Sequence, residues 1–458
     1  MLASTNVEEI VQGQKAFFAT GKTQDIPFRK EQLKQLKKAI NDYENDLIDA
    51  LFQDLGKSKF EGTLTEIAYC REELDSIRKN LDTWAKPKPV KSPISFFPAK
   101  SFIIPEPLGN VLIIGAWNYP FQLVIMPLLG AIASGNCAIV KPSEMTPKTS
   151  KVIADLISQT FDPNYITVVE GDKTIAQQLL QQKFDHIFYT GSPAVGKIVM
   201  KAAAENLTPV TLELGGKSPC IAEPDIHVEH SARRIIWGKF LNAGQSCIAP
   251  DYLLVNRGIK EEMIAAMKDC LREFYGENPA ESPDYARIVN DQHFNRLSEF
   301  LDDGKIIVGG ETDAENCYIA PTLLDSVSWD DAVMQEEIFG PILPILEYDE
   351  LESAIAQIND RPKPLALYFF SQDQAKQNQV LQNTSAGGVT LNDTMLHFVS
   401  TKLPFGGVGE SGMGAYHGKA SFDTFTHYKS VTKRQFWLDL KLRYPPYADK
   451  LKFIKLLL

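Results

Sequence analysis

Cys247 lies in a run of small residues that leaves its sulfur open to close approach. The surrounding stretch reads LNAGQSCIAP, in which Gly244, Ser246 and Ala249 flank the cysteine. Because a thiolate is a nucleophile, a carbon atom that reaches this sulfur can be attacked there. Most cysteines act only as small apolar residues, so the loop alone leaves both interpretations open.

Two further polar residues directly follow apolar runs that are typical of buried strands. Glu213 lies in TLELGGKSP, and Asn118 lies in GAWNYPF. Side chains at the carboxyl ends of parallel strands face the ligand crevice of an α/β sheet. A carboxylate there is a candidate general base, and an amide is a candidate donor to a developing oxyanion. Local hydrogen bonding at a strand end or turn is the alternative for each.

A glycine turn in HIFYTGSPAVGKIVM is a candidate phosphate-binding element. An apolar run leads through Thr190, Gly191 and Ser192 into a helical pattern that contains Gly196. The first amides of such a helix bind phosphate groups, although any tight strand-to-helix turn favours a glycine.

One literal GxGxxG pattern, at Gly407, Gly409 and Gly412, does not fit a phosphate loop. LPF precedes it in place of a strand, and more glycine follows in place of a helix. A dinucleotide fingerprint needs both flanking elements, so we expect a flexible glycine-rich loop here.

Charged and aromatic side chains elsewhere are candidates for contacts with a nucleotide. Lys141 follows a strand-like run in VKPSE, where an ammonium group can meet ribose or phosphate. In QEEIFGPILP, Glu336 or Glu337 can bind ribose hydroxyls while Phe339 packs on a flat ring.

The composition excludes several classes of partner. The 458 residues carry a formal net charge of -11, and no basic stripe is present, so nucleic acid is not an expected partner. Six scattered cysteines without a CxxC pair predict reduced thiols and no metal site. The acidic N-terminus lacks the features of a signal peptide, which predicts a cytoplasmic protein.

The periodicity of apolar residues predicts the framework that positions these candidates. Helical patterns extend to about Trp84, and the proline-dense segment KPKPVKSPISFFPAKSFIIPEP suits extended edge strands. From Asn110, strand-like runs such as NVLIIG and CAIVKPS alternate with helical segments, and the alternation resumes after Gly216. This alternation predicts two α/β domains with parallel sheets.

Taken together, the motifs resemble those of the aldehyde dehydrogenase superfamily. GAWNYPF, GNCAIVKPSE, YTGSPAVG, LELGGKSP, NAGQSCIAPDY, EEIFGPILP and LPFGGVGESGMGAYHGK occur in that family's order over about residues 5–445. The N-terminus and GQSCIAPDY are most similar to the class 3 branch, which acts on fatty and aromatic aldehydes. The resemblance implies an α/β fold with a Rossmann-type NAD-binding domain, an α/β catalytic domain and a small β bridging element for oligomerisation.

The resemblance also implies domain boundaries and a homodimer. The expected parts are an NAD(P)-binding domain (1–85 and 104–210), a catalytic domain (211–395), a bridging element (86–103 and 420–436) and a C-terminal tail (437–458). The tail ends in DKLKFIKLLL, whose lysines alternate with apolar residues. Weak peripheral contact with a membrane and docking on the protein's own surface are equal alternatives for it.

The catalytic roles implied by the resemblance are those of a covalent dehydrogenase. Cys247 would attack the aldehyde, Asn118 and the Cys247 backbone N–H would form the oxyanion hole, and Glu213 would activate the water that hydrolyses the thioester. Branches that transfer the acyl group to coenzyme A typically lack this glutamate, which favours hydrolysis to the acid. An acyl-transferring or reductive member and a non-catalytic binding protein on the same fold remain the alternatives.

The expected cofactor is NAD, with NADP as an open alternative. Glu337 would hold the nicotinamide ribose, Phe339 would pack near the ring and Lys141 would contact the adenosine ribose. Pro193–Ala194 after the phosphate-turn serine resembles class 3 relatives that also accept NADP, whereas a carboxylate at Glu144 would disfavour a 2′-phosphate. The residues expected to bind the cofactor are Trp117, Lys141, Glu144, Thr190, Gly191, Ser192, Gly196, Gly215, Glu337 and Phe339.

Positions that match the family's aldehyde tunnel are largely aromatic or apolar. They favour a long-chain aliphatic, aromatic or isoprenoid-derived aldehyde over a charged one, and core packing is the alternative for each. The expected substrate-binding residues are Tyr119, Met126, Trp237, His397 and Phe405.

Overall fold

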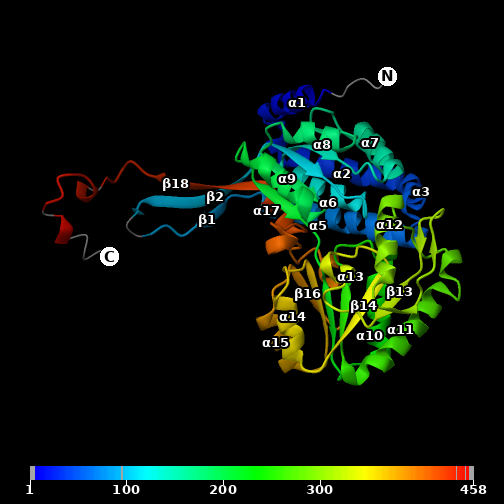
Figure 1. The fold of residues 1–458 in the computed structure, drawn as a ribbon. Helices are drawn as coiled ribbons and strands as arrows, with labels where there is room; N and C mark the ends of the chain where they lie inside the picture. Colours follow the sequence, from blue (N-terminus) through cyan, green and yellow to red (C-terminus); the bar gives the residue numbers. More distant parts are fainter. Residues whose placement is uncertain (1–5, 94–95, 440, 449, 453–458) are drawn as a thin grey trace.

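Two α/β lobes and a projecting β arm make up the molecule (Figure 1). This computed structural model describes residues 6–93, 96–439, 441–448 and 450–452. Most of the expected tail end therefore lies outside the described residues. No helix in the described ranges is both long and apolar enough to cross a membrane.

Helices form the N-terminal part of the chain, as the periodicity predicts. Asn6 and Asp25 cap the first two long helices by accepting from the amides of Glu9 and Phe28. A π-helical segment at 63–68 lies between the fourth and fifth of these helices. The helices are α1 (Val7–Ala19), α2 (Ile26–Asp42), α3 (Glu44–Leu55), α4 (Lys59–Gly62) and α5 (Tyr69–Trp84).

The first sheet has the strand order of a doubly wound dinucleotide-binding fold. Its order is β17-β7-β6-β3-β4-β5, and all neighbours are parallel except β17. The chain order reverses between β3 and β6, which is the topological switch point where such sheets bind ligands. The strands are β3 (Asn110–Ile114), β4 (Cys137–Lys141), β5 (Ile166–Val168), β6 (His186–Thr190), β7 (Val210–Glu213) and β17 (Gly412–Met413).

Helices connect these strands and cover the sheet (Figure 1). The first of them is buried along its whole length, and its side chains contribute to the largest apolar core. The connecting helices are α6 (Gln122–Ser134), α7 (Pro147–Thr160), α8 (Lys173–Leu180) and α9 (Pro193–Ala204).

The glycine-rich segment that we expected to be a flexible loop is ordered, which corrects that expectation. Gly412 pairs with Glu213 and Met413 pairs with Leu212, so β17 extends the first sheet. Glycine is required here because a Cβ on Gly412 would lie 2.2 Å from the carbonyl oxygen of Leu212. The parallel pairing of β7 with β6 places residues 210–213 in the first sheet. The expected domain boundary, between 210 and 211, falls inside this strand.

The second sheet has the order β10-β13-β14-β9-β8-β15-β16, with only β10 antiparallel to its neighbour. Its central strands are buried, as expected for a sheet with helices on both faces. The strands are β8 (Pro219–Ala222), β9 (Tyr252–Asn256), β10 (Lys305–Val308), β13 (Thr322–Asp325), β14 (Ile342–Tyr348), β15 (Ala366–Phe370) and β16 (Gly388–Leu391). The main helices are α10 (Val228–Phe240), α11 (Lys260–Tyr275), α12 (Asp291–Glu299), α14 (Leu351–Asn359) and α15 (Gln374–Asn383).

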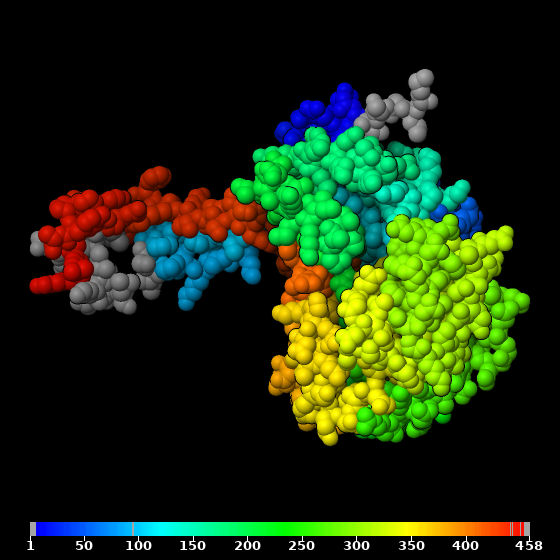
Figure 2. Space-filling model, in the orientation of Figure 1, coloured from blue at the N-terminus to red at the C-terminus, as the bar shows by residue number. Residues whose placement is uncertain are grey.

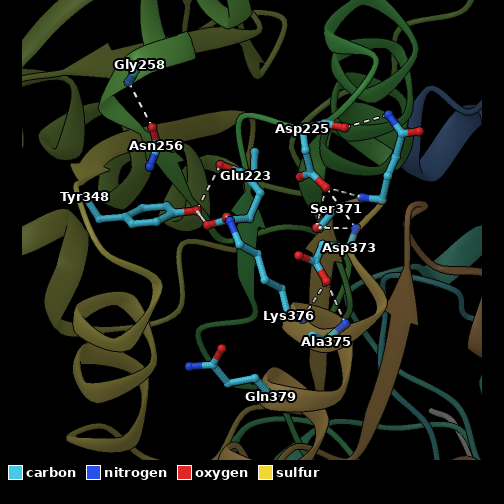
Figure 3. Close-up of polar contacts among 12 residues, drawn as sticks. Glu223, Asp225, Asn256, Gly258, Tyr348, Ser371, Asp373, Ala375, Lys376 and Gln379 are labelled. Atoms are coloured by element: carbon cyan, nitrogen blue, oxygen red, sulfur yellow. Dashed lines mark hydrogen bonds and ion pairs between the residues drawn. The ribbon is translucent and has the colours of Figure 1, made fainter.

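A polar cluster closes one end of the second sheet (Figure 3). The buried carboxylate of Glu223, just after β8, accepts from the hydroxyl of Tyr348 and pairs with Lys376 of α15. Asp225 accepts from the Ser371 hydroxyl at 3.0 Å and from nearby backbone amides. The cluster ties β8 to the start of α15.

The arm is a three-stranded antiparallel sheet that projects from the first lobe (Figure 2). Its strands are β1 (Lys88–Val90), β2 (Ala99–Pro107) and β18 (Thr426–Arg434), with β2 in the centre. The register pairs Ser101 with Thr432, whose hydroxyls are 3.2 Å apart. The expectation that the proline-dense segment forms edge strands is confirmed for β1 and wrong for β2, which is the central strand although it contains Pro105 and Pro107.

Candidate active site

A predominantly apolar cavity of about 660 Å³ extends from Cys247, and part of this space opens to solvent. Residues of both lobes line it. Thr190 and Glu213 come from the first sheet, and Trp237 comes from α10. The remaining lining residues are Leu64, Thr65, Tyr69, Tyr119, Gln122, Leu123, Leu241, Ser246, Ile248, Met395, Phe398, Val399, Phe405 and Tyr416.

The loop before Cys247 has an unusual backbone. Asn242, Ala243 and Gly244 are all left-handed, with φ of 53°, 51° and 73°. Non-glycine residues in this region are strained, and such strain persists only where the surroundings hold it. A Cβ on Gly244 would lie 2.2 Å from the carbonyl oxygen of Gly340. The small residues thus allow close packing of this loop on the 340 region as well as access to the sulfur.

The surroundings of the half-buried Cys247 thiol favour its neutral form. Burial raises its pKa well above the usual range, and the carboxylates of Glu337 and Glu213 raise it further. The backbone amides of Cys247 and Ile248 act in the opposite direction. The thiol therefore needs a proton acceptor before it can attack as a thiolate.

Glu213 ends β7 with its carboxyl group inside the cavity wall. Glu213 pairs in register with Thr190 on β6, and Glu213 is only 3% exposed. Among the described residues, neither carboxylate oxygen has a hydrogen-bond partner. Burial raises its pKa well above the ordinary value, which makes its carboxylate a stronger base than that of an exposed glutamate.

Asn118 lies on the loop between β3 and α6 and contacts the cysteine loop. Its Nδ2 donates to the carbonyl oxygen of Gln245 at 3.1 Å. The backbone carbonyl oxygen of Asn118 accepts from Nζ of Lys57 at 2.8 Å and from Nδ2 of Asn242 at 2.9 Å. An amide carries two N–H groups, so Nδ2 keeps one donor for an oxyanion beside Cys247.

Glu337 packs directly on Gly215 at the junction of the two lobes. Burial raises the pKa of its carboxyl group to about 8, and nearby Asp251 adds to the shift. The ring of Phe339 lies 5.3 Å from that of Trp117, in an edge-to-face arrangement. The structure thus brings four of the expected cofactor-binding residues together.

Sequence reasoning missed the residues that hold this loop. Arg296 donates to the carbonyl oxygens of Glu337 and Ile338, at 3.3 and 2.6 Å. Asp251 accepts from the amide of Ile338 at 2.9 Å and pairs with Lys217 at 2.5 Å. Arg296 lies on α12 and the other two residues lie in loops, and no local sequence pattern marks these contacts.

The expected phosphate turn has fewer free amides than the motif suggests. Ser192 caps α9, and its hydroxyl accepts from the amide of Val195 at 3.4 Å. Pro193 has no N–H group, so Ala194 carries the remaining first-turn donor. Gly196 allows close packing, since a Cβ there would lie 2.8 Å from Leu214.

Glu144 lines a separate hollow after β4, and the buried Lys141 at the end of β4 pairs with it. Nζ of Lys141 is 2.6 Å from Oε2 of Glu144 and also donates to the carbonyl oxygen of Pro142 at 3.1 Å. The hollow is lined by Pro142, Glu144, Pro147, Ser150, Glu170 and Gly171. Its place at a strand end of the first sheet fits the adenosine half of a dinucleotide.

Two of the five expected substrate-binding residues do not line the cavity in the described part of the chain. Met126 is buried in the core on α6, one turn beyond Gln122, which does line it. His397 lies behind Phe405, with the ring centroids 6.0 Å apart, and contacts the Thr390 hydroxyl at 2.9 Å. Tyr119, Trp237 and Phe405 line the cavity as expected.

Residues of the N-terminal helices contribute a wall that the sequence did not indicate. Leu64, Thr65 and Tyr69 reach the cavity from the π-helical segment and the start of α5. Their helical periodicity is equally consistent with ordinary core packing, so only the tertiary fold identifies them.

The fold and the arrangement of these residues are those of a class of enzyme, the dinucleotide-dependent oxidoreductases, and a cysteine thiol lies beside the cavity. The residues present fit a nicotinamide cofactor, because Thr190 and Glu337 present polar atoms that lack partners among the described residues. Thr190 lines the cavity at the end of β6, beside the switch point of the first sheet, and Glu337 packs on Gly215, which follows β7.

Comparisons with known proteins identify the family. The sequence profile described as "Aldehyde dehydrogenase family" matches residues 2–431. The chain is 53% identical to 4,4'-diaponeurosporen-aldehyde dehydrogenase of Staphylococcus aureus (strain NCTC 8325 / PS 47), over 98% of both chains. It is 47% identical to "Aldehyde dehydrogenase, dimeric NADP-preferring" of Rattus norvegicus, over 98% of this chain and 99% of the other.

A solved structure supports the same assignment. The chain matches "Substrate bound state of Staphylococcus Aureus AldH" with a TM-score of 0.97 and 53% identity, covering 98% of this chain and 99% of that one. Mammalian members of family 3 are among the other similar chains. The chain belongs to the aldehyde dehydrogenase family, which confirms the resemblance, the fold class, the enzyme class and NAD(P) as cofactor.

Proposed function

We propose that this enzyme oxidises apolar aldehydes to carboxylic acids by covalent catalysis at Cys247. The single observation that carries the proposal is the apolar cavity that converges on Cys247, Glu213 and Thr190. The name of the Staphylococcus aureus relative, which refers to an apolar isoprenoid aldehyde, supports the substrate class.

Acylation begins when the half-buried Cys247 thiol gives its proton to solvent water and its sulfur attacks the aldehyde carbon. The free N–H of Asn118 and the backbone amide of Cys247 donate to the oxyanion that develops. Bound NAD(P)⁺ supplies the hydride acceptor, and the acyl group stays on the sulfur as a thioester. Tyr119, Trp237 and Phe405 exclude water from the apolar part of the substrate.

Glu213 completes the reaction as the base that activates water. Its carboxyl group has a raised pKa and no competing partner among the described residues. Proton transfer from water to this carboxylate generates the nucleophile that releases the acid. An intact Glu213 favours hydrolysis over transfer of the acyl group to coenzyme A.

The cofactor is proposed to span the edge of the first sheet. Glu337, Gly215, Trp117 and Phe339 would hold the nicotinamide half, and Lys141 with Glu144 would hold the adenosine half. The turn at Thr190–Gly196, including Gly191 and Ser192, would face the pyrophosphate. The Lys141–Glu144 pair supports a preference for NAD, because a 2′-phosphate beside that carboxylate would meet like charge.

We propose a homodimer in which the arm contacts the second copy. Lys88, Lys100, Lys429 and Lys433 are exposed on the arm, whereas the whole chain is acidic with a net charge of -11. The arm of one copy and the body of another therefore have complementary charge. The word "dimeric" in the name of the rat relative supports this state. Sedimentation at several concentrations tests it, and a lone 51.1 kDa species would contradict it.

A cytoplasmic location and a weak membrane contact of the tail are further proposals. The tail contact is tested by sedimentation with anionic lipid vesicles, comparing the full chain with a chain that ends at Phe436. Equal sedimentation of the two would contradict a role for the tail.

The reaction is tested with purified protein, NAD and a panel of aliphatic, aromatic and isoprenoid aldehydes. NADH formation and free acid without coenzyme A are expected, and Cys247→Ala should abolish both. Glu213→Gln should still give one rapid turnover but accumulate the thioester, which intact-protein mass spectrometry detects. Cofactor binding without turnover of any aldehyde would contradict the proposal and support a binding protein on this fold.

A further inference from the structure

Lys57 and Glu66 form a fully buried ion pair beneath the site. Nζ of Lys57 lies 2.6 Å from Oε1 of Glu66, and both side chains are 0% exposed. The pair belongs to the α4 and π-helical region, outside the residues assigned above to the reaction. Burial of two charges costs several kcal/mol per ion, so such a pair is weak evidence for a role in stability.

Glu66 binds the start of α6 with its second oxygen. Oε2 accepts from the backbone amides of Phe121 and Gln122, at 3.2 and 2.9 Å. Amides in the first turn of a helix have no acceptor within the helix. Glu66 therefore fixes where α6 begins.

Lys57 binds the residues directly before that start. Its Nζ donates to the carbonyl oxygen of Asn118 at 2.8 Å and lies 4.0 Å from the ring centroid of Tyr119. Tyr119 lines the cavity, and Asn118 is the proposed oxyanion donor. The ion pair thus holds both ends of the segment 118–122.

The same segment is tied to the cysteine loop on its other side. Nδ2 of Asn242 donates to the Asn118 carbonyl oxygen at 2.9 Å, and Nδ2 of Asn118 donates to Gln245. With the backbone of Asn118 held by two donors, its side-chain amide has little freedom relative to Cys247. Misplacement of a reacting group by about 1 Å can cost about 100-fold in rate.

We propose that Lys57 and Glu66 are positioning residues that fix the Asn118 amide in the oxyanion hole. The proposal rests on the proposed function of Asn118. Loss of the Lys57 ammonium leaves the Asn118 backbone carbonyl oxygen with Asn242 as its remaining donor and lets the side-chain amide turn away from the sulfur. The first acylation step then slows, while the thiol and Glu213 stay intact.

A double-mutant cycle tests the proposal by the rate of the first NADH turnover. Asn118→Ala should lower this rate about 100-fold, the usual effect of removing an oxyanion donor. Lys57→Met should lower it at least about 10-fold through misplacement of that donor. In the Asn118→Ala background, Lys57→Met should change the rate by less than about threefold, because the group it positions is gone.

A second variant covers the case in which Lys57→Met leaves Glu66 as an unpaired buried charge and the protein does not fold. The double change Lys57→Met with Glu66→Gln removes both charges and keeps an acceptor for the α6 amides. Its rate should fall as for Lys57→Met, and the fall should again vanish in the Asn118→Ala background.

Glu223→Gln is the matched control, since it disrupts another ion pair of a buried carboxylate, and neither Glu223 nor Lys376 lines the cavity. Figure 3 shows this pair. It should leave the first-turnover rate within about twofold, as expected for a change that touches no group of the site. The positioning role would be overturned if the fold-decreases in first-turnover rate of the Lys57 and Asn118 variants multiplied in the double variant. A wild-type rate for the Lys57 variants would overturn it as well. The proposed function itself would fail separately, through an inactive wild type or an active Cys247→Ala.

Discussion

Gly215 and Glu337 are in contact across the two lobes: a Cβ on Gly215 would lie 1.9 Å from Oε2 of Glu337. Gly215 directly follows β7 in the first sheet, and Glu337 comes from the loop before β14. The absence of a side chain at one residue therefore sets the position of the carboxylate at the other. This contact makes the cofactor role proposed for Glu337 testable without removing its charge.

Gly215→Ala should weaken binding of NAD about 10-fold. The backbone at 215 is outside the left-handed region, so alanine itself is tolerated and the displaced group is the Glu337 carboxylate. Tenfold in affinity corresponds to about 1.4 kcal/mol, the scale of one altered polar contact. Fluorescence titration with NADH measures the effect, with Glu337→Gln alongside. Unchanged affinity in both variants would exclude Glu337 from the cofactor site.

The buried carboxyl of Glu213 should make stability depend on pH. Burial raises its pKa, so between the ordinary and the raised value the folded protein keeps a proton that the unfolded chain releases. Stability is therefore lost as the pH rises through this window. Glu337 acts in the same direction, because burial raises the pKa of its carboxyl group from 4.5 to about 8.

Glu213→Gln should accordingly raise the melting temperature more at pH 8 than at pH 5. Glutamine is neutral at both values and keeps the shape of the side chain. Scanning calorimetry at the two pH values measures the difference, with Glu223→Gln as the comparison. An equal change at both pH values would mean that Glu213 is not buried as an isolated carboxyl group.

The sequence indicated the alternation of strands and helices after Asn110, because these elements have a clear apolar period and some, such as α6, end at a glycine. It also marked Cys247, Glu213 and Asn118 as candidates, since each follows a short run typical of a buried strand or lies among small residues. These signals are local. They depend on a few neighbouring residues and survive without knowledge of the fold.

Contacts between distant segments were not predictable in this way. The Lys57–Glu66 pair joins the turn between α3 and α4 and the π-helical segment to the loop after β3, and nothing in the local pattern marks either residue as buried. Met126 shows the converse error: it lies on a helix that is apolar on every side, so periodicity cannot distinguish the cavity face from the core. Pairing of Gly412 with Glu213 likewise joins residues that are far apart in the chain.

Gly412→Ala should destabilise the protein by about 2 kcal/mol and lower its activity. The residue has φ of 144° and no room for a Cβ beside the carbonyl oxygen of Leu212. Changes of this size are typical where a special backbone conformation is lost. Because Gly412 pairs with Glu213, the displaced strand should also disturb the proposed base.

Urea unfolding measures this effect, and Gly409→Ala in the same segment is the matched control. Gly409 also has a positive φ, of 65°, but its nearest neighbour to a new Cβ is the flexible side chain of Lys363 at 3.5 Å. A loss at Gly409 as large as that at Gly412 would show that backbone strain alone, and not the strand contact, is responsible.

Trp237→Ala should raise KM for long or aromatic aldehydes more than for short ones. Trp237 lines the cavity, so its removal takes apolar contact from the part of the substrate beyond the aldehyde group. The expected difference in kcat/KM between a long and a short aldehyde is about 10-fold or more, from roughly 1.5–3 kcal/mol of lost burial. Met126→Leu, in the core, should change kcat/KM for the long and the short aldehyde by the same factor. Loss of chain-length preference in the Met126 variant alone would contradict the assignment of the cavity.

Glu144→Gln should shift cofactor preference toward NADP about 10-fold in the ratio of kcat/KM values. Glu144 neutralises Lys141 at 2.6 Å, and its carboxylate would repel a 2′-phosphate in the hollow after β4. Removing the charge frees the Lys141 ammonium for that phosphate, and a like-charge contact of this kind costs several kcal/mol. Glu170→Gln, in the same hollow but not paired with Lys141, is the control. Equal shifts in both variants would mean that the overall potential of the hollow, and not the Lys141–Glu144 pair, selects the cofactor.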